Sequence, residues 1–173
     1  ATYLVLAPEH PLLNSIVLPQ NIEAVKSYIE SAKVKTEIER MSVDRSKTGV
    51  FTGSYAVNPI NKAEIPIWVA DYVVSSYGTG AIMAVPSGDE RDFEFAKAFN
   101  LPIVEVVSID GKLHGNDECF SNYGISVNSG EYSGKSTEKV QELINAKLDE
   151  IGCGGTKIQY KLHDWLISRQ RYW

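Results

Sequence analysis

One segment of the sequence combines glycine turns, a short apolar run and a cluster of carboxylates: Tyr77-Gly-Thr-Gly-Ala-Ile-Met-Ala-Val-Pro-Ser-Gly-Asp-Glu-Arg-Asp92. The apolar part, residues 81–85, is bounded by turn signals and is typical of a buried strand. Asp89 stands where a helix N-cap belongs, and further carboxylates fall in the first turn of the helix that follows. The segment therefore predicts a strand-to-helix corner that presents carboxylates beside open backbone amides.

The composition is that of one ordinary globular domain. Of 173 residues, 43% are hydrophobic and 23% are charged, so a core of useful size can form. The net charge of −5 argues against a nonspecific nucleic-acid binder, which would usually be basic. The negative charge does not exclude a domain that binds only the end of an RNA whose body is bound elsewhere. Because no apolar run approaches the length of a membrane helix, we expect no membrane partner.

Residues that usually bind metals are few and scattered. Cys119 and Cys153 are the only cysteines and form no CxxC pair, so we expect reduced thiols and no metal site. His10 lies between two prolines and is predicted to be a hydrogen-bonded loop histidine.

Short strands separated by glycine and proline turns occupy residues 47–86. The glycine-punctuated run 47–57 predicts a strand with a bulge or tight bend. Pro66 predicts that the strand 65–70 either lies at a sheet edge or begins near the proline. This pattern indicates a barrel-like, mainly antiparallel β core. With the helices that decorate this core, the fold class is α+β.

The remaining elements follow from apolar periodicity. Asn21 is a candidate cap for an amphipathic helix that continues toward Arg45, and Ser136 or Thr137 for a helix whose apolar face reaches Ile151. Further strands are predicted at 2–7, 101–108, 125–128 and 156–162.

Several motifs resemble the editing domain of bacterial-type leucyl-tRNA synthetases. They are TGVFTGSYAVNP at 48–59, IWVADY at 67–72, YGTGAIMAVP at 77–86 and DERDFEFA at 89–96. The sister isoleucyl and valyl enzymes typically have a histidine-containing stretch in place of residues 83–85. The sequence AIMAVP at 81–86 therefore favours the leucyl branch. DWLISRQRYW at 164–173 resembles the return to the synthetic domain. The resemblance implies an editing domain at 1–162 and a return segment at 163–173, and both abrupt ends suggest a piece of a longer protein.

The resemblance implies hydrolysis of the ester of tRNA(Leu) that carries isoleucine, methionine, norvaline or a similar noncognate amino acid. A second site is needed because one apolar pocket discriminates poorly between side chains that differ by a methylene. The parent enzyme would join leucine to tRNA(Leu) with ATP. Editing itself would need no cofactor, since ATP and Mg²⁺ serve the synthetic domain. The implied partners are the tRNA 3′ end and the rest of the synthetase, in the cytoplasm, or in an organelle for a eukaryotic source.

The resemblance also implies roles for the carboxylates of the corner. Asp92 would bind the α-ammonium group of the substrate, since the helix dipole and backbone amides would keep it ionised. The alternative is a capping-box carboxylate that only stabilises the helix. Asp89 would cap the helix, with orientation of water or substrate as a second role. Arg91 is either a structural partner or a tRNA contact.

The other site residues precede these carboxylates. Tyr77 is similar to a tyrosine that contacts the terminal adenosine or the substrate, and Gly78 and Thr79 would allow close backbone approach. Met83 and Val85 point the same way along the strand and would line the side-chain pocket. The alternative for this pair is plain core.

No serine or cysteine nucleophile with a nearby base stands out in the sequence. The resemblance implies hydrolysis by a positioned water assisted by a ribose hydroxyl. Two departures from the family pattern matter. Ser87-Gly88 replaces the usual Ala-His, and a threonine-rich strand that forms the opposite wall of the pocket should precede Ala1. We therefore expect weak or no hydrolysis by this fragment. The alternatives are a noncatalytic module that binds the tRNA 3′ end, and a generic α+β protein whose corner is structural.

Overall fold

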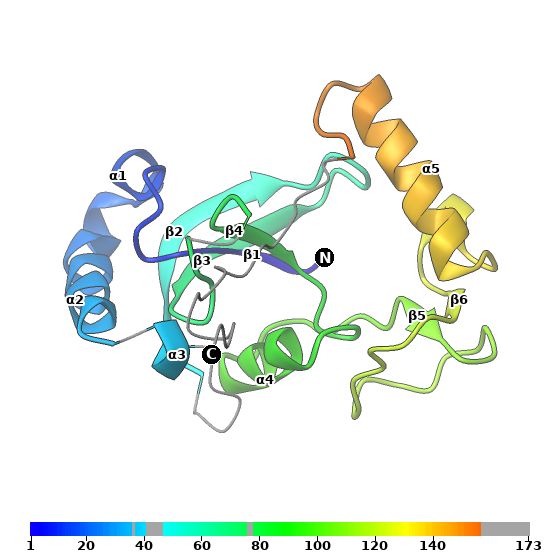
Figure 1. Cartoon of the computed structure of the whole chain (residues 1–173), viewed down its shortest axis with the longest axis horizontal. Helices are drawn as coiled ribbons and strands as arrows, with labels where there is room; N and C mark the ends of the chain where they lie inside the picture. The colour runs from blue at the N-terminus through cyan, green and yellow to red at the C-terminus, as the bar shows by residue number, and fades with distance from the viewer. Residues whose placement is uncertain (36, 41–46, 76–77, 157–173) are drawn as a thin grey trace, which may run out of the picture.

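A twisted four-stranded sheet with strand order β2-β3-β1-β4 forms the centre of the protein (Figure 1). The structure is a computed structural model that describes residues 1–35, 37–40, 47–75 and 78–156. A separate two-stranded sheet pairs β5 with β6. The strands are β1 Tyr3–Leu6, β2 Gly49–Val57, β3 Glu64–Ala70, β4 Ala81–Ala84, β5 Val107–Ser108 and β6 Ile125–Ser126.

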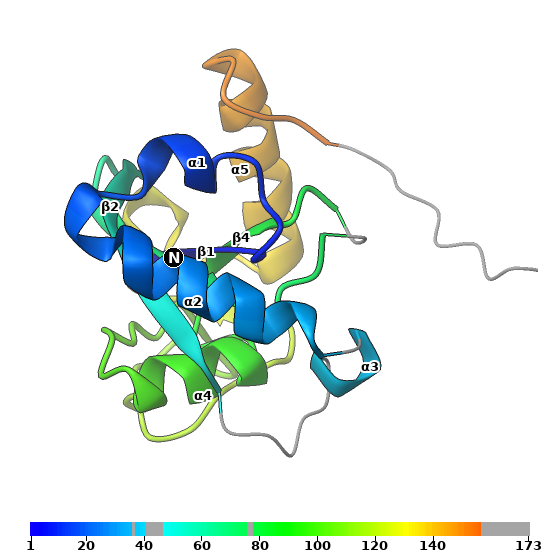
Figure 2. The same ribbon diagram turned by 90° about the vertical axis from the view of Figure 1, so that its left-hand side faces the viewer.

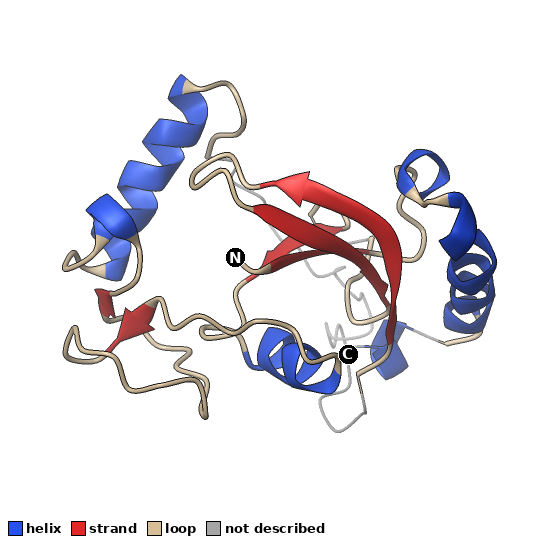
Figure 3. Cartoon of the chain, turned by 180° about the vertical axis from the view of Figure 1, so that it is seen from behind, coloured by secondary structure: helices blue, strands red, loops and turns tan. Residues whose placement is uncertain are grey.

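The strand pairings confirm the mixed α+β class. β1 runs parallel to β3, whereas β2 with β3 and β1 with β4 are antiparallel pairs. The helices are α1 Leu13–Ile16, η1 Pro19–Asn21, α2 Ile22–Lys33, α3 Glu37–Arg40, α4 Glu90–Ala98, η2 Gly130–Tyr132 and α5 Thr137–Glu150. Within the described residues the main sheet is open, as the red strands in Figure 3 show, so closure into a barrel stays a prediction.

Alternating side chains give the sheet two buried faces, because successive residues of a strand point to opposite sides. Tyr3 and Val5 of β1 join a cluster with Phe95 of α4. Leu6 joins a second cluster with Leu13 of α1 and Val25 of α2. Figure 2, the view turned by 90°, shows α2 and α4 as separate layers beside the sheet. The strands are thus held between two groups of helices.

The predicted bulge in β2 is confirmed. The register with β3 shifts between Phe51 and Tyr55, and Gly53 between them has φ 87°. A Cβ atom at Gly53 would lie 2.9 Å from Cβ of Leu18, so both the backbone angle and the space favour glycine.

Three local predictions need correction at the first helices and β3. Asn21 holds the cap position of α2, but its amide donates to the Phe51 carbonyl, because the preceding 3₁₀ turn places it against β2. The long helix stops at Lys33, α3 is a separate turn, and residues 41–45 lie outside the described part. Pro66 lies near the start of β3, as one alternative predicted, but β3 lies between β2 and β1 and is therefore not an edge strand.

The second half of the chain has less sheet than predicted. Of the expected strand 101–108 only Val107–Ser108 pairs, since its partner β6 is equally short. Leu101 and Ile103 pack on the Phe95 cluster without strand pairing. The cap of α5 is Ser136, as predicted. The apolar face of α5 is only partly buried in the described structure, and the expected strand at 156–162 lies outside it from residue 157 onward.

Phe95 should be the most sensitive position of the core. Its ring is fully buried and lies 4.5–5.7 Å, between centroids, from four aromatic rings: Tyr3, Trp68, Tyr72 and Phe99. Phe95→Ala should lower the free energy of unfolding by about 3–5 kcal/mol, measured by urea denaturation. Phe93→Ala on the same helix is the matched control, because Phe93 is only partly buried. Equal losses in both variants would contradict the assignment.

Candidate functional site

The predicted corner exists, and Asp89 caps its helix. The Asp89 Oδ1 atom accepts hydrogen bonds from the backbone N–H groups of Arg91 at 2.9 Å and Asp92 at 3.2 Å. The guanidinium group of Arg91 lies 3.6 Å from Asp89 Oδ2, with both side chains about half exposed, so Arg91 makes the contact expected of a structural partner. The alternative, a tRNA contact, stays a prediction. Capping by Asp89 is therefore confirmed. Its second role, toward water or substrate, stays a prediction.

The Asp92 carboxylate is buried and bonded through both oxygens. The residue is 5% exposed. Its Oδ1 atom accepts a hydrogen bond from the Tyr72 hydroxyl at 2.9 Å, and its Oδ2 atom accepts one from the Val85 N–H at 3.0 Å. The carboxylate therefore joins the end of β4 and the segment after β3 to the first turn of α4.

These contacts exclude the capping-box alternative for Asp92. In a capping box the carboxylate would accept from the N–H of the cap residue. Here the Asp89 N–H donates to the Val85 carbonyl at 3.2 Å, and the Asp92 carboxylate faces the sheet. The side chain thus has a role beyond stabilising its own helix.

Burial shifts the titration of Asp92. Burial raises the pKa of this carboxyl above its ordinary value of 3.8, and the hydrogen bonds from Tyr72 and Val85 oppose the rise without cancelling it. The prediction from the helix terminus considered only the groups that favour the ionised form and omitted this cost of losing water. A cation beside the carboxylate would lower the pKa again.

Two buried tyrosines surround Asp92, and the motif analysis did not assign them to the site. Burial, followed by the charge of Asp92, raises the pKa of both Tyr3 and Tyr72 far above the ordinary value, so both hydroxyls stay protonated donors. The Tyr3 hydroxyl donates to the Asp92 carbonyl at 2.8 Å. A sequence signal did exist, since a tyrosine in a buried strand or at its end usually needs a polar partner.

Met83 and Val85 show the predicted alternation beside this carboxylate. Met83 is 46% exposed, Ala84 is fully buried, and Val85 is partly buried. The plain-core alternative is wrong for Met83, because nearly half of the residue reaches the surface. An exposed methionine on the strand that leads to Val85, whose N–H bonds the Asp92 carboxylate, can contact the apolar part of a ligand. Contact with a substrate side chain stays a prediction for both residues.

Gly78 and Thr79 of the turn before β4 are exposed, whereas Gly80 of the same turn is buried. Gly78 and Gly80 have φ angles of 69° and 71°, and a Cβ atom at Gly78 would meet no described residue within 4 Å. The Thr79 hydroxyl lies 3.3 Å from the Ala81 backbone nitrogen. The backbone at Gly78 is thus open to a ligand, as expected. Tyr77 lies outside the described residues, so its role stays a prediction.

A distant loop packs on the turn that contains Ser87. The Phe120 N–H donates to the Ser87 carbonyl at 2.9 Å. Ser87 is 5% exposed, and its hydroxyl has no hydrogen-bond partner among the described residues. Burial, followed by the nearby carboxylates of α4, raises the pKa of Cys119 in this loop. The Ser87 hydroxyl is therefore a polar group that a water or ligand could satisfy.

His10 lies beside the glycine turn of the corner, because a Cβ atom at Gly80 would lie 3.4 Å from the His10 Cδ2 atom. The His10 Nδ1 atom accepts the Leu12 N–H at 3.2 Å, as predicted for a loop histidine. Across the described ranges, no group of three or more His, Cys, Asp or Glu side chains could hold a metal ion. None of the helices described here combines the length and apolar character needed to cross a bilayer.

Comparison with known proteins places this geometry in context. The family model described as "Leucyl-tRNA synthetase, editing domain" matches residues 1–149. The chain belongs to this family. It is 52% identical over 179 residues to a leucine–tRNA ligase of Rhodopirellula baltica, covering 100% of this chain and 19% of that protein. It is 52% identical over 172 residues to a leucine–tRNA ligase of Clostridium perfringens strain 13, covering 99% of this chain and 21% of that protein.

A solved structure agrees with the sequence matches. The fold is similar to that of Agrobacterium radiobacter K84 agnB2 LeuRS in its ternary complex with tRNA and LeuAMS, with a TM-score of 0.65 and 34% identity. The match covers 95% of this chain and 17% of that chain. The chain thus spans about a fifth of the length of the leucine–tRNA ligases that it resembles.

Asp92 should give this editing domain an unusual pH dependence of stability. With a raised folded-state pKa, Asp92 destabilises the fold as pH rises from 3.8 through that pKa, and has no such effect at lower pH. Asp92→Asn should therefore gain stability relative to the parent as the pH rises from 3.8 through the folded-state pKa of Asp92, measured by urea unfolding. Asp110→Asn is the control of opposite sign, because the hydrogen bond with His114 lowers the pKa of Asp110. A stability difference that stays constant with pH would contradict the burial argument.

Proposed function

We propose that residues 1–162 act as an editing domain that hydrolyses the ester of tRNA(Leu) charged with isoleucine, methionine, norvaline or a similar noncognate amino acid. The observation that carries this proposal is the Asp92 carboxylate, which is buried and held from two sides beside Val85, the partly buried residue that directly follows β4. Membership of the leucyl-tRNA synthetase editing family supports the same reaction.

Asp92 binds the α-ammonium group of the substrate. Each carboxylate oxygen accepts one hydrogen bond from the protein, from the Tyr72 hydroxyl or the Val85 N–H, and each has a further lone pair available. Since burial raises the pKa of this carboxyl, an incoming ammonium group lowers it again and gains a charge-assisted hydrogen bond. The site therefore favours a substrate with a free amino group.

The other contacts arrange the ester around this anchor. Met83 and Val85 contact the amino-acid side chain from the strand. Tyr77, Gly78 and Thr79 receive the terminal nucleotide, where the open backbone at Gly78 permits close approach. With the ammonium group fixed at one end and the nucleotide at the other, the ester carbonyl has little freedom to move.

The chemistry is the addition of water to that carbonyl. The water oxygen bonds to the carbonyl carbon and loses a proton, and the resulting tetrahedral intermediate expels the ribose oxygen. That oxygen takes up a proton, which leaves a free amino acid and uncharged tRNA. Asp89 and an adjacent ribose hydroxyl orient the water, and no covalent enzyme intermediate forms.

The wider protein context belongs to the same proposal. The partners are the 3′ end of tRNA(Leu) and the rest of a leucine–tRNA ligase, to which residues 163–173 return. Those residues lie outside the described structure. ATP and Mg²⁺ serve the synthetic domain, and editing requires no cofactor. The site of action is the cytoplasm, or an organelle in a eukaryotic source.

Hydrolysis should depend on Asp92. The parent for the test is the Clostridium perfringens ligase, in which this chain replaces the matching segment, because the relative shares 52% identity over 172 residues. Asp92→Asn should slow release of isoleucine from isoleucyl-tRNA(Leu) by at least about thirtyfold, as expected when a buried ion pair loses one partner. Release of radiolabelled isoleucine is the measurement.

Asp110→Ala is the matched control, because Asp110 is an exposed carboxylate in the loop after β5 and should leave hydrolysis unchanged. Equal, background-level release from the parent and Asp92→Asn would reject the enzymatic proposal. Binding of the charged tRNA without hydrolysis would instead support a noncatalytic module for the tRNA 3′ end.

A further inference from the structure

The segment after β3 is buried, but it pairs with no strand among the described residues. Residues 71–74 are each 5–8% exposed and follow the last residue of β3, Ala70. Buried backbone carbonyls outside regular structure need other donors, and leaving them without one is costly. The partners of this segment therefore determine where its side chains lie.

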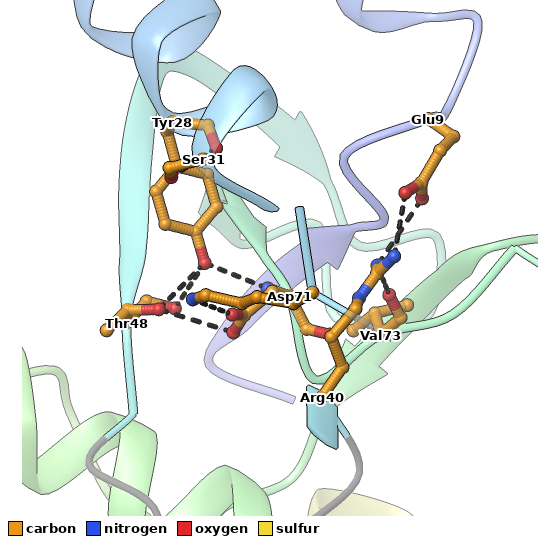
Figure 4. Close-up of polar contacts among 8 residues, drawn as sticks. Glu9, Tyr28, Ser31, Arg40, Thr48, Asp71 and Val73 are labelled. Carbon is orange, nitrogen blue, oxygen red and sulfur yellow. Dashed lines mark hydrogen bonds and ion pairs between the residues drawn. The ribbon is translucent and has the colours of Figure 1, made fainter. Parts of the chain in front are cut away.

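One arginine supplies those donors. Arg40 of α3 is 8% exposed. Its Nε atom donates to the Asp71 carbonyl at 2.8 Å, and its Nη2 atom donates to the Val73 carbonyl at 2.9 Å. Its Nη1 atom also pairs with Glu9 Oε1 at 2.7 Å. A planar guanidinium thus bridges the two carbonyls on either side of Tyr72 while a carboxylate balances its charge (Figure 4).

Asp71 is fixed from α2 as well. Lys35, just beyond α2, pairs with Asp71 Oδ2 at 2.6 Å, and the Thr48 hydroxyl lies 3.3 Å from Asp71 Oδ1. The Asp71 N–H donates to the Tyr28 hydroxyl at 2.9 Å. Figure 4 shows Tyr28 of α2 and Thr48, the residue before β2, beside Asp71. Hydrogen bonds and an ion pair therefore hold the backbone N–H, the backbone carbonyl and the carboxylate of Asp71.

We propose that Arg40 is a positioning residue of the editing site: by bridging the carbonyls of Asp71 and Val73, it aims the Tyr72 hydroxyl at the Asp92 carboxylate. The connection is short, because Tyr72 lies between the two clamped carbonyls and its hydroxyl is 2.9 Å from Asp92 Oδ1. The proposal rests on the proposed role of Asp92 as the ammonium anchor. It gives the α2–α3 region, which lies away from the corner, a part in hydrolysis.

The titrating surroundings of Asp92 come from several elements. Five titratable or charged groups interact electrostatically with the Asp92 carboxylate. They are Tyr3 of β1, Tyr72 after β3, Asp89 and Arg91 at the start of α4, and Cys119 of the distant loop. Among these, Tyr72 is the group whose hydrogen bond most favours the charged carboxylate. Loss of that bond therefore raises the pKa of Asp92 further.

The test compares single and double variants in two settings. Arg40→Lys keeps the charge but offers its donors from one nitrogen, so it cannot bridge both carbonyls and Glu9. Tyr72→Phe removes only the hydroxyl. Lys33→Met in α2 is the control, since Lys33 makes an exposed ion pair with Glu30. Hydrolysis of isoleucyl-tRNA(Leu) against pH is measured in the chimeric ligase, and the Asp92 carboxyl is titrated by ¹³C NMR in the 173-residue chain.

Arg40→Lys and Tyr72→Phe should each slow hydrolysis by about tenfold at neutral pH, the size expected for one hydrogen bond to a charged group. Both should move the acidic limb of the pH profile and the NMR titration of Asp92 to higher pH. The double variant should be no worse than Tyr72→Phe alone, because both changes remove the same interaction. Lys33→Met should match the parent.

An unchanged Asp92 titration in folded Arg40→Lys, or effects of Arg40→Lys and Tyr72→Phe that add in full, would overturn the proposal and leave Arg40 as a purely structural residue. Near-ultraviolet circular dichroism establishes that each variant is folded. The two proposals fail separately. If the parent chimera releases no isoleucine but the pKa of Asp92 still rises in both variants, the positioning of Tyr72 by Arg40 is supported. The proposed editing role of Asp92 is then rejected.

Discussion

Burial of one carboxylate organises the corner of this editing domain. An isolated buried charge is costly. The Tyr72 hydroxyl and the Val85 N–H bond the two oxygens of Asp92 and offset part of that cost. These two donors come from segments that flank different strands, β3 and β4. The carboxylate therefore requires both segments in register with α4, and the sheet, the helix and the candidate site form one arrangement.

The two-faced sheet makes this arrangement rigid. Phe95 and its aromatic neighbours fill the face toward α4, while Leu6 and Val69 pack toward α1 and α2. A helix on each side leaves the strands little freedom to shift. The Arg40 contacts extend this constraint from the α2–α3 side to the segment that carries Tyr72. The position of the Asp92 carboxylate thus depends on residues on both faces of the main sheet.

The sequence predicted local features that depend on near neighbours. The Asp89 cap, the Gly53 bulge and the alternation at Met83 all follow from residues within a few positions, and the motifs alone led to the family. Long-range pairing was harder to predict. Three features depend on residues far away in sequence: the interior position of β3, the short length of β5 and the hydrogen bond from Tyr72 to Asp92. The raised pKa of Asp92 likewise depends on burial by distant residues. Local periodicity carries no information about such partners.

The strand order has a consequence for how the chain folds as it is made. β1 is synthesised before β3 and β4, the two strands that flank it, and its pairing with them is complete only when Ala84 is available. At a synthesis rate of about 5–20 residues per second, β1 waits several seconds, roughly, for its last partner in this sheet. During that interval Leu4 and Leu6 lack the neighbours that β3 and β4 supply in the folded sheet, and an apolar strand without its partners is prone to wrong pairing.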